Sequence, residues 1–509
     1  MIFPSLRFLL AAAALLAAGS LTAAPLADAY KVDDIAFPAN VPPEVGALDF
    51  DAQGTLYVAL RRGDVLTAKP VADPKAFAWK FFATGFDNGC GLEVAAPGRV
   101  LITQMAELTE ASDSDGDGVA DRYRMVNDGW GLSGNYHETN SLVPDGKGGY
   151  YLAIGTASHN GPIFEHPKGE YSKFGRRGRN FSAVKYRGWT LHLGADGKLT
   201  PFASGFRMQN GLTLDDEGNL WSSDNQGDWK ETTPVYHVRQ GKFYGHPSSL
   251  VWDERWPADK DPIATYRADL DAYNAHRTKA AVLVPHMEVC RSGSEPIMIP
   301  RNANFGPFGG QMLLPDNNSA RIARIMLEKV DGEYQGAATL FINQQGLRSG
   351  NNRVRFSPDG KTLFVGQTVR GWGRPAEGLQ RVAWQNAGAP FTIQMINITP
   401  TGYRLTFTAP FNDEAKKAAN YTVKTMVYQP KWTYGSEPHV RNEAVASVRP
   451  VDDRTVELNF GSLQPGCVYH IALNEAVKST TQEAPAFRDF YYTANRVPTA
   501  ARAPLAGRL

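Results

Sequence analysis

The chain has 509 residues, of which 42% are hydrophobic, 11% aromatic and 21% charged, and 53 Lys and Arg residues nearly balance 52 Asp and Glu residues. This composition is typical of an ordered protein rather than a disordered one, and the length predicts two domains. A formal charge of +1, with no basic run interleaved with aromatic residues, argues against a nucleic-acid partner.

The first residues predict an export signal. Arg7 supplies a positive start, an apolar stretch runs from Phe8 to Ala18, and small residues near Ala23 and Ala24 suit a cleavage site. The alternative, an anchor helix, is disfavoured because the apolar stretch is short for a bilayer span. We therefore expect residues 1–24 to be a cleaved signal peptide. The mature chain shows no later segment suited to crossing a membrane, which favours a periplasmic or secreted protein.

A strand–turn–strand sequence motif recurs from residue 47 to about residue 366. Each copy is an apolar alternation, a turn containing Asp or Gly, and a second alternation, which is the pattern of a β-hairpin. Six copies at uneven spacing predict an all-β, six-bladed β-propeller over residues 28–386, because radial closure protects the edges of its sheets. Four clear copies and two looser ones begin at Ala47, Ser141, Gly211 and Arg353, and at Gly91 and Pro296.

The strongest local motif is an acidic loop with the spacing Asp113-x-Asp115-x-Asp117-Gly118-x-x-Asp121. Alternating carboxylates on a short turn suit a hard divalent cation. Position twelve is Arg124 rather than the glutamate of an EF-hand, so we expect a shorter loop that binds calcium for structure, with Asp113, Asp115, Asp117 and Asp121 as ligands. The alternative is a solvated acidic turn.

A second set of residues follows from propeller geometry, because residues that lead into the innermost strands converge near the central axis. That position is taken by His137, Asn210 and Arg353 in three copies, and Arg207 lies just before the second. A histidine, arginines and an amide make a candidate site with a proton acceptor and an anion-binding group. The alternative for His137 is a loop hydrogen bond with no chemical role.

A polar stretch from Ser222 to Pro247 follows one of these strands. Asp224, Asn225 and Asp228 could line the mouth of the channel, or could equally satisfy backbone groups in a long connection. Two insertions interrupt the repeats, a basic Gly-rich loop over 157–189 and a partly helical segment over 252–281 that we expect to be a cap.

From residue 389 to residue 498 the sequence pattern changes to short segments of alternating apolar and polar residues, with turn signals every 8 to 12 residues or so. This pattern predicts an Ig-like or fibronectin-like β-sandwich with an accessory role. The three cysteines, Cys90, Cys290 and Cys467, allow one disulfide that the sequence cannot pair. No C-x-x-C-H motif is present, so the chain carries no c-type haem of its own.

The segment "GFRMQNGLTLDDEGNLWSSDNQGDW" resembles part of the soluble pyrroloquinoline-quinone (PQQ) sugar dehydrogenases, as do "HETNSLVPDGKGGYYLAIGT" and "NNRVRFSPDGKTLFVGQTVRGWG". The likeness is closest to exported dehydrogenase-like propellers that are often fused to a cytochrome c domain. It implies that His137 is the base that takes a hydroxyl proton as hydride moves to the quinone, and that Arg353 and Arg355 contact the cofactor. The chain departs from the family at Met208 and Asn210, where the family has Asn and Gln, and at His246, where it has Trp.

We therefore expect an exported PQQ-dependent oxidoreductase that acts on a sugar or polyol and passes electrons to a separate acceptor, a cytochrome or a quinone. Two alternatives stay open. One is a metal-dependent hydrolase or lyase of the lactonase type, in which Asn210 and Asp224 supply oxygen ligands. The other is a non-catalytic propeller that binds glycans or a protein partner. The residues placed at the cofactor are Arg207, Asn210, Asp224, Arg353 and Arg355.

Overall fold

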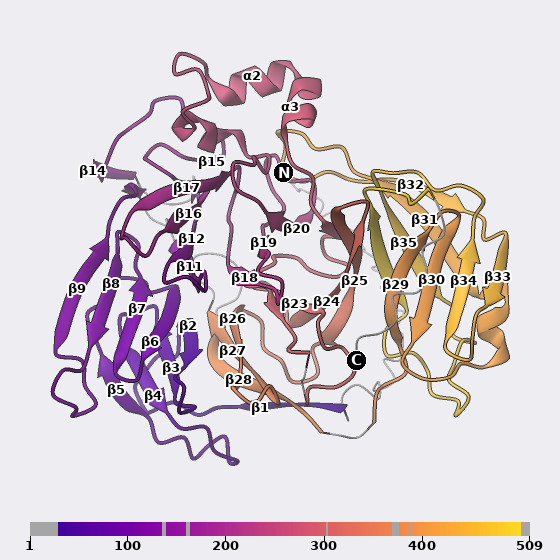
Figure 1. Cartoon of the computed structure of the whole chain (residues 1–509), viewed down its shortest axis with the longest axis horizontal. Helices are drawn as coiled ribbons and strands as arrows, with labels where there is room; N and C mark the ends of the chain where they lie inside the picture. The colour runs from indigo at the N-terminus through magenta and orange to yellow at the C-terminus, as the bar shows by residue number, and fades with distance from the viewer. Residues whose placement is uncertain are drawn as a thin grey trace, which may run out of the picture.

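The computed structural model describes residues 29–134, 139–158, 163–301, 304–368, 376–385 and 388–499. Strands dominate this part of the chain, and its two α-helices, α2 (Pro262–Ala268) and α3 (Leu270–His276), are short. They stand at the top of the molecule in Figure 1, where the sequence predicts a partly helical cap. Among the described residues, no helix has the length and apolar character needed to span a membrane.

Six antiparallel four-stranded units follow one another along the chain. The first three consist of β2 (Val45–Phe50), β3 (Leu56–Leu60), β4 (Val65–Ala68) and β5 (Lys80–Ala83); β6 (Gly91–Ala96), β7 (Arg99–Thr103), β8 (Leu108–Ser112) and β9 (Arg122–Asn127); and β11 (Thr139–Pro144), β12 (Tyr150–Ile154), β16 (Trp189–Leu193) and β17 (Leu199–Ser204).

The fourth unit consists of β18 (Leu212–Leu214), β19 (Leu220–Ser223), β20 (Thr233–Val238) and β21 (Val282–Val284). The fifth has β22 (Ile297–Met298), β23 (Met312–Pro315), β24 (Arg321–Val330) and β25 (Glu333–Asn343). The sixth has β26 (Asn351–Phe356), β27 (Thr362–Thr368) and β28 (Glu377–Trp384), completed by β1 (Tyr30–Asp34). Two small ribbons, β10 (Leu132–Gly134) with β14 (Ile163–Lys168) and β13 (Ala157–Ser158) with β15 (Asn180–Phe181), lie outside the units.

The six units form a closed, propeller-like ring (Figure 1). β2 contacts β6, β6 contacts β11, β11 contacts β18, β18 contacts β22, β23 contacts β26, and β26 returns to β2. The N-terminal strand β1 pairs along its whole length with β28, from Tyr30 opposite Trp384 to Asp34 opposite Gln380. The sixth unit is therefore built from both ends of the ring, which leaves it no free edge at that point.

The Asp/Gly turns that mark the repeats in the sequence close the first hairpins of the units. Asp51 Oδ1 accepts hydrogen bonds from the backbone N–H groups of Gln53 (2.9 Å) and Thr55 (2.7 Å). Asp145 and Asp215 make the same pair of bonds two and four residues ahead. An aspartate that satisfies its own turn fixes the register of the strands on either side.

The C-terminal strands form two sheets that pack around one core. One has β29 (Ile393–Thr399), β30 (Gly402–Phe407), β33 (Ser447–Pro450) and β34 (Thr455–Asn459), and the other has β31 (Tyr421–Val427), β32 (His439–Glu443), β35 (Cys467–Leu473) and β36 (Asp489–Ala494). Aromatic and β-branched side chains from both sheets fill this core together with Met326, Val330 and Ala337 of the fifth unit.

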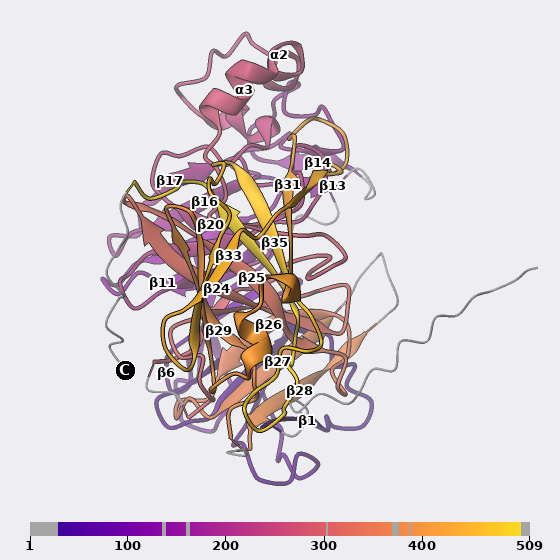
Figure 2. The same cartoon turned by 90° about the vertical axis from the view of Figure 1, so that its right-hand side faces the viewer.

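The second of these sheets is continuous with the ring, a feature that the sequence does not predict. β36 pairs with β25 through Ala337 opposite Tyr492 and its neighbours, so the fifth unit and the C-terminal strands make one eight-stranded sheet. Figure 2 shows β31 and β35 in front of the ring in this arrangement. The C-terminal region is thus joined to the ring by shared sheet and shared core. No disulfide joins Cys90, Cys290 and Cys467, all of which lie among the described residues and are buried.

Candidate functional site

Arg353, a fully buried residue of β26, lies where four of the six units meet. Its Nε donates to the carbonyl of Cys90 (2.9 Å), its Nη2 to the carbonyl of Asn140 (2.6 Å), and its Nη1 to the carbonyl of Asn210 (2.9 Å). These carbonyls belong to the units that contain β6, β11 and β18, so one guanidinium ties four units together. A guanidinium has five N–H donors, and the protein's own acceptors engage all three nitrogens.

Asn210 lies directly beside Arg353, as the propeller geometry predicts for residues of that position. Its Oδ1 accepts from Arg353 Nη1 (3.1 Å), and its Nδ2 donates to Asn352 Oδ1 (3.1 Å). Both ends of the amide are therefore used inside the protein. His137, the third residue assigned to this position, lies outside the described residues.

Arg355 lies two residues further along β26, in an acidic environment. Its Nε is 3.2 Å from Asp49 Oδ1 and 3.3 Å from the carbonyl oxygen of Leu48. Glu93 and Glu295 face the same guanidinium. Burial raises the pKa of Glu93 to about 7, with the charge of Asp49 adding to the rise and Arg355 opposing it. Burial likewise raises the pKa of Glu295. Arg355 therefore compensates buried carboxylates.

Asp224, which the sequence places at the cofactor, is fully buried and holds a turn. Its Oδ2 accepts from the backbone N–H of Arg207 (2.7 Å), and its Oδ1 accepts from the backbone N–H of Met208 (2.8 Å) and of Asn225 (2.8 Å). The ammonium of Lys230, also buried, lies 3.2 Å from Oδ2. Burial lowers the pKa of Lys230, and the charge of Asp224 opposes that change. With both oxygens engaged, Asp224 is poorly suited to bind a metal ion.

Arg207 differs from the other arginines, because only part of its guanidinium is engaged. Its Nε donates to Asp228 Oδ1 (2.7 Å), and within the described ranges its two terminal nitrogens make no hydrogen bond. The side chain is only 8% exposed, so the guanidinium is largely shielded from solvent. Partly buried N–H groups of a fixed guanidinium are suited to bind a carboxylate or another planar anion.

Asp228 is held by groups from two further positions, His246 and Asn180. Its Oδ2 lies 3.2 Å from His246 Nε2 and accepts from the backbone N–H of Asn180 (3.2 Å), while His246 Nδ1 lies 2.9 Å from Ser248 Oγ. Burial alone would raise the pKa of Asp228, but the hydrogen bonds and charges of His246 and Arg207 outweigh it and hold the pKa well below its usual range. Asp228 is therefore a permanent anion that orients Arg207.

Gly227 and Tyr434 complete the surroundings of Arg207, and neither was predicted from the sequence. A Cβ at Gly227 would lie 2.1 Å from Arg207 Nε and 2.2 Å from Cζ, so the guanidinium lies flat against a backbone that only glycine provides. The ring of Tyr434, from the connection between β31 and β32, lies 5.5 Å from Arg207 Cζ. His246 and Asp228 carried a sequence signal as polar residues of the Ser222–Pro247 stretch, whereas Gly227 and Tyr434 carried none.

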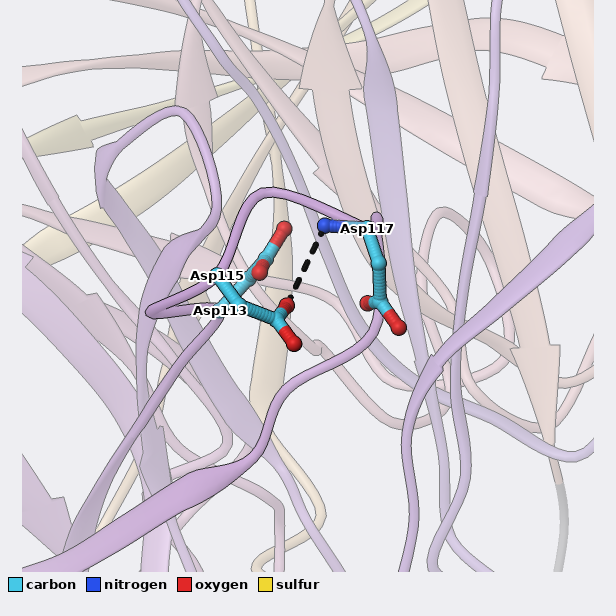
Figure 3. A group of neighbouring side chains, drawn as sticks. All are labelled: Asp113, Asp115 and Asp117. Carbon is cyan, nitrogen blue, oxygen red and sulfur yellow. Dashed lines mark hydrogen bonds between the residues drawn. The ribbon is translucent and has the colours of Figure 1, made fainter.

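The acidic loop connects β8 and β9 at the outside of the ring (Figure 1). Carboxylate oxygens of Asp113, Asp115 and Asp117 lie within 4.8 Å of one another (Figure 3), which suits a hard cation. Asp121 is turned aside, because its carboxylate accepts from the backbone N–H (2.9 Å) and the hydroxyl (2.6 Å) of Ser114. That hydroxyl lowers the pKa of Asp121, and the backbone N–H of Gly118 lowers the pKa of Asp113.

The chain was compared with family models, curated proteins and solved structures. A family model described as a domain of unknown function (DUF7133) matches residues 72–281. No curated protein matches the chain. Similar solved structures include a putative oxidoreductase (glucose dehydrogenase) from Thermus thermophilus, with 17% identity and a TM-score of 0.46 over 69% of this chain and 99% of that one.

Two further structures are sugar dehydrogenases that contain PQQ. The holo PQQ domain of pyranose dehydrogenase from Coprinopsis cinerea has 14% identity and a TM-score of 0.48, over 70% of this chain and 95% of that one. The PQQ-bound aldose sugar dehydrogenase of Streptomyces coelicolor has 15% identity and a TM-score of 0.46, over 70% and 98%. Both proteins are of the kind that the sequence motifs resemble.

Proposed function

We propose that the chain is an exported PQQ-dependent oxidoreductase that acts on a hydroxyl or aldehyde group of a sugar or polyol, at the site around Arg207. The observation that carries the proposal is the guanidinium of Arg207, whose Nε is fixed by buried Asp228 while its terminal nitrogens are left without a partner among the described residues. In this proposal the six units are the blades of a propeller over residues 28–386. Residues 1–24 are the signal peptide, and residues 389–498 form a β-sandwich.

The residues fit an anionic cofactor at one arginine rather than at three. PQQ carries carboxylates, and Arg207 offers free N–H groups for one of them. Arg353 and Arg355 already serve carbonyls and carboxylates of the protein, so we assign them to the support of the site and not to the cofactor. Asn210 and Asp224 belong to the same support, because their polar atoms hold Arg353 and the turn before Met208.

The chemistry divides between the cofactor and His137. When bound, PQQ supplies a two-electron acceptor for the hydride of the substrate carbon. His137 takes the substrate hydroxyl proton on an imidazole nitrogen, as the motif resemblance implies, and Arg207 keeps its charge against the anion. Electrons leave to a separate cytochrome or quinone. A calcium ion held by Asp113, Asp115 and Asp117 stabilises the outer loop and takes no part in the reaction.

The test is a titration of calcium-loaded protein with PQQ, followed by absorbance and calorimetry, with dye reduction by aldoses as the activity. Arg207→Gln removes a charge-assisted contact worth about 1.5–3 kcal/mol, so we expect PQQ affinity to fall by roughly 10- to 150-fold. His137→Ala is expected to bind PQQ and to lose dye reduction. Arg441→Gln, at an exposed arginine on β32, is the matched control.

Failure of the wild-type protein to bind PQQ would refute the proposal. Cleavage of lactones or glycosides in the presence of added metals would then identify a hydrolase or lyase. Equal affinities for PQQ in wild type and Arg207→Gln would show that the cofactor lies elsewhere.

A further inference from the structure

The connection between β31 and β32, residues 428–438, leaves the C-terminal sheets and runs toward α3 at the top of Figure 1. Backbone hydrogen bonds fasten it to the segment that carries Gly227 and Asp228. Gly435 N–H donates to the carbonyl of Gly227 (3.0 Å), and Trp229 N–H donates to the carbonyl of Lys431 (3.0 Å). The C-terminal region therefore supplies one wall of the site around Arg207.

Gly435 shows how closely the two segments approach. Its φ is +65°, and a Cβ on it would lie 2.7 Å from the side-chain amide carbon of Gln226. Any other residue at this point would be strained and would push the connection away from Gln226. The connection is thus held in one position over the ring.

Two aromatic side chains on this connection are exposed to solvent, and the guanidinium of an arginine lies over each ring. Tyr434 is 53% exposed and lies 4.9 Å from Arg179 Cζ, and Trp432 is 37% exposed and lies 5.4 Å from Arg267 Cζ. We call these four residues the arginine–aromatic rim. Tyr434 also borders Arg207, so the rim begins at the proposed cofactor site and extends outward to α2.

The two rim arginines are exposed and, across the part of the chain that the structure describes, take part in no ion pair. Stacking on a ring orients the plane of a guanidinium and leaves its N–H edges available. The chain around Arg179 is itself fixed, because Asn180, its buried neighbour, donates its backbone N–H to Asp228 and its Nδ2 to Thr156 Oγ1 (3.2 Å).

We propose that the arginine–aromatic rim binds an acidic oligosaccharide, with uronic-acid carboxylates on Arg179 and Arg267 and sugar rings against Tyr434 and Trp432. The binding itself does not depend on the proposed function. The inference rests on the proposed function where it takes the bound saccharide to be the substrate of the site around Arg207. Guanidinium edges match carboxylates in a bidentate way, and the exposed parts of aromatic side chains suit the C–H faces of pyranose rings. Two arginines on separate elements fit a ligand with more than one carboxylate.

The test measures binding by calorimetry without PQQ, so that it does not depend on turnover. The probes are trigalacturonate, its methyl ester, which has the same sugars without charge, and triglutamate, which has carboxylates without sugars. We expect trigalacturonate to bind at least tenfold tighter than either of the other two, and the difference to shrink at high salt.

Variants assign the binding to the rim. Arg179→Gln and Arg267→Gln are expected to weaken trigalacturonate five- to tenfold each and to leave the methyl ester unchanged. Tyr434→Ala and Trp432→Ala are expected to weaken both sugars. Arg441→Gln, an exposed arginine of β32 outside the rim, is expected to change neither.

The outcomes separate the two ideas. Equal binding of trigalacturonate and its ester, equal binding of triglutamate, or equal weakening by Arg441→Gln overturns the rim proposal, even if PQQ supports dye reduction with neutral aldoses. Rim-dependent binding of trigalacturonate by a protein that does not bind PQQ refutes the oxidoreductase and leaves the rim as a binding site for acidic sugars.

Discussion

Arg353 and Arg207 are both buried arginines, but they have opposite surroundings. Arg353 donates from every nitrogen to backbone carbonyls of Cys90, Asn140 and Asn210. Among the described residues, the guanidinium of Arg207 donates from Nε alone, to Asp228, and it has a glycine backbone on one face. All three nitrogens of the first guanidinium are engaged by the protein, whereas the terminal N–H groups of the second have no acceptor within the described part of the chain and are available to a bound anion.

This contrast shows what decides the role of a buried charge. Desolvation of a guanidinium is costly, and the cost is offset either by acceptors inside the protein or by a ligand. Where internal acceptors suffice, the arginine stabilises the fold. Where a single buried carboxylate only orients it, the remaining donors favour an anion from outside.

The largest effect is expected from Arg353→Met, which leaves backbone carbonyls of three neighbouring units without their donor. We expect the free energy of unfolding to fall by about 4 kcal/mol, measured by urea denaturation followed by circular dichroism. Arg441→Met, at an exposed arginine, is the control and should change it by less than about 0.5 kcal/mol. A loss below about 1 kcal/mol for Arg353→Met would mean that its bonds are dispensable, and the contrast with Arg207 would fail.

Glu93 sharpens the same contrast through pH, because it is a buried carboxyl group beside the charges of Asp49 and Arg355. Its pKa in the folded protein, about 7, lies above the ordinary value of 4.5. As pH rises through this window the unfolded chain loses the proton first, so stability should fall between pH 4.5 and 7. Glu93→Gln removes this slope and should raise the free energy of unfolding by at most about 3 kcal/mol at pH 8.

The measurement for Glu93 is the urea midpoint of wild type and variant from pH 4.5 to pH 8. The two curves should meet at the acid end and separate toward the alkaline end. If the two curves of urea midpoint against pH ran parallel, Glu93 would not titrate in this range. Arg355 would then already neutralise its charge, and no excess of buried negative charge would remain around Arg355.

Gly227→Ala tests the other half of the contrast. The added methyl group would overlap Arg207, whose Nε and Cζ lie 2.1 Å and 2.2 Å from the Cβ position, so the guanidinium must leave Asp228. We expect a loss of about 1–2 kcal/mol in stability and a fall in PQQ affinity of tenfold or more. In an Arg207→Gln background the same substitution should cause little further loss of affinity. Additive losses in the double variant would place the effect of Gly227 elsewhere.

The repeats could be read from the sequence because their signals are local. Asp51, Asp145 and Asp215 each bond to backbone groups within four residues, and the hairpins follow from these turns. The site could be predicted only in part. The spacing indicates that Asn210 and Arg353 converge, as they do, but nothing near them or near Arg207 in the sequence tells which donors are already used.

The remaining features depend on contacts between distant segments. Arg353 bonds to a carbonyl 263 residues away, and β25 joins β36 across more than a hundred residues of intervening chain. Tyr434 reaches Arg207 only because that shared sheet directs the connection after β31 over the ring. Periodicity and spacing describe neighbours along the chain, and therefore carry no information about which C-terminal loop covers which part of the ring.

The smallest effect is expected at the acidic loop, which lies at the outside of the ring. The carboxylate of Asp113 accepts from the N–H groups of Gly116 (2.7 Å) and Gly118 (2.9 Å), so the turn forms without an ion. Calcium at tenfold its dissociation constant should then stabilise the wild-type protein by about 1.4 kcal/mol. Asp115→Asn should reduce this gain, while Asp121→Asn, whose carboxylate bonds to Ser114, should reduce it less.

The measurement for the acidic loop is the melting temperature with calcium and with chelator, next to PQQ affinity under the same two conditions. A calcium ion that only stabilises the loop leaves PQQ affinity unchanged. If chelation abolished PQQ binding in both the wild-type protein and Asp115→Asn, the effect would not come from the acidic loop. It would require a second calcium ion beside Arg207, bound to the same anion as the guanidinium.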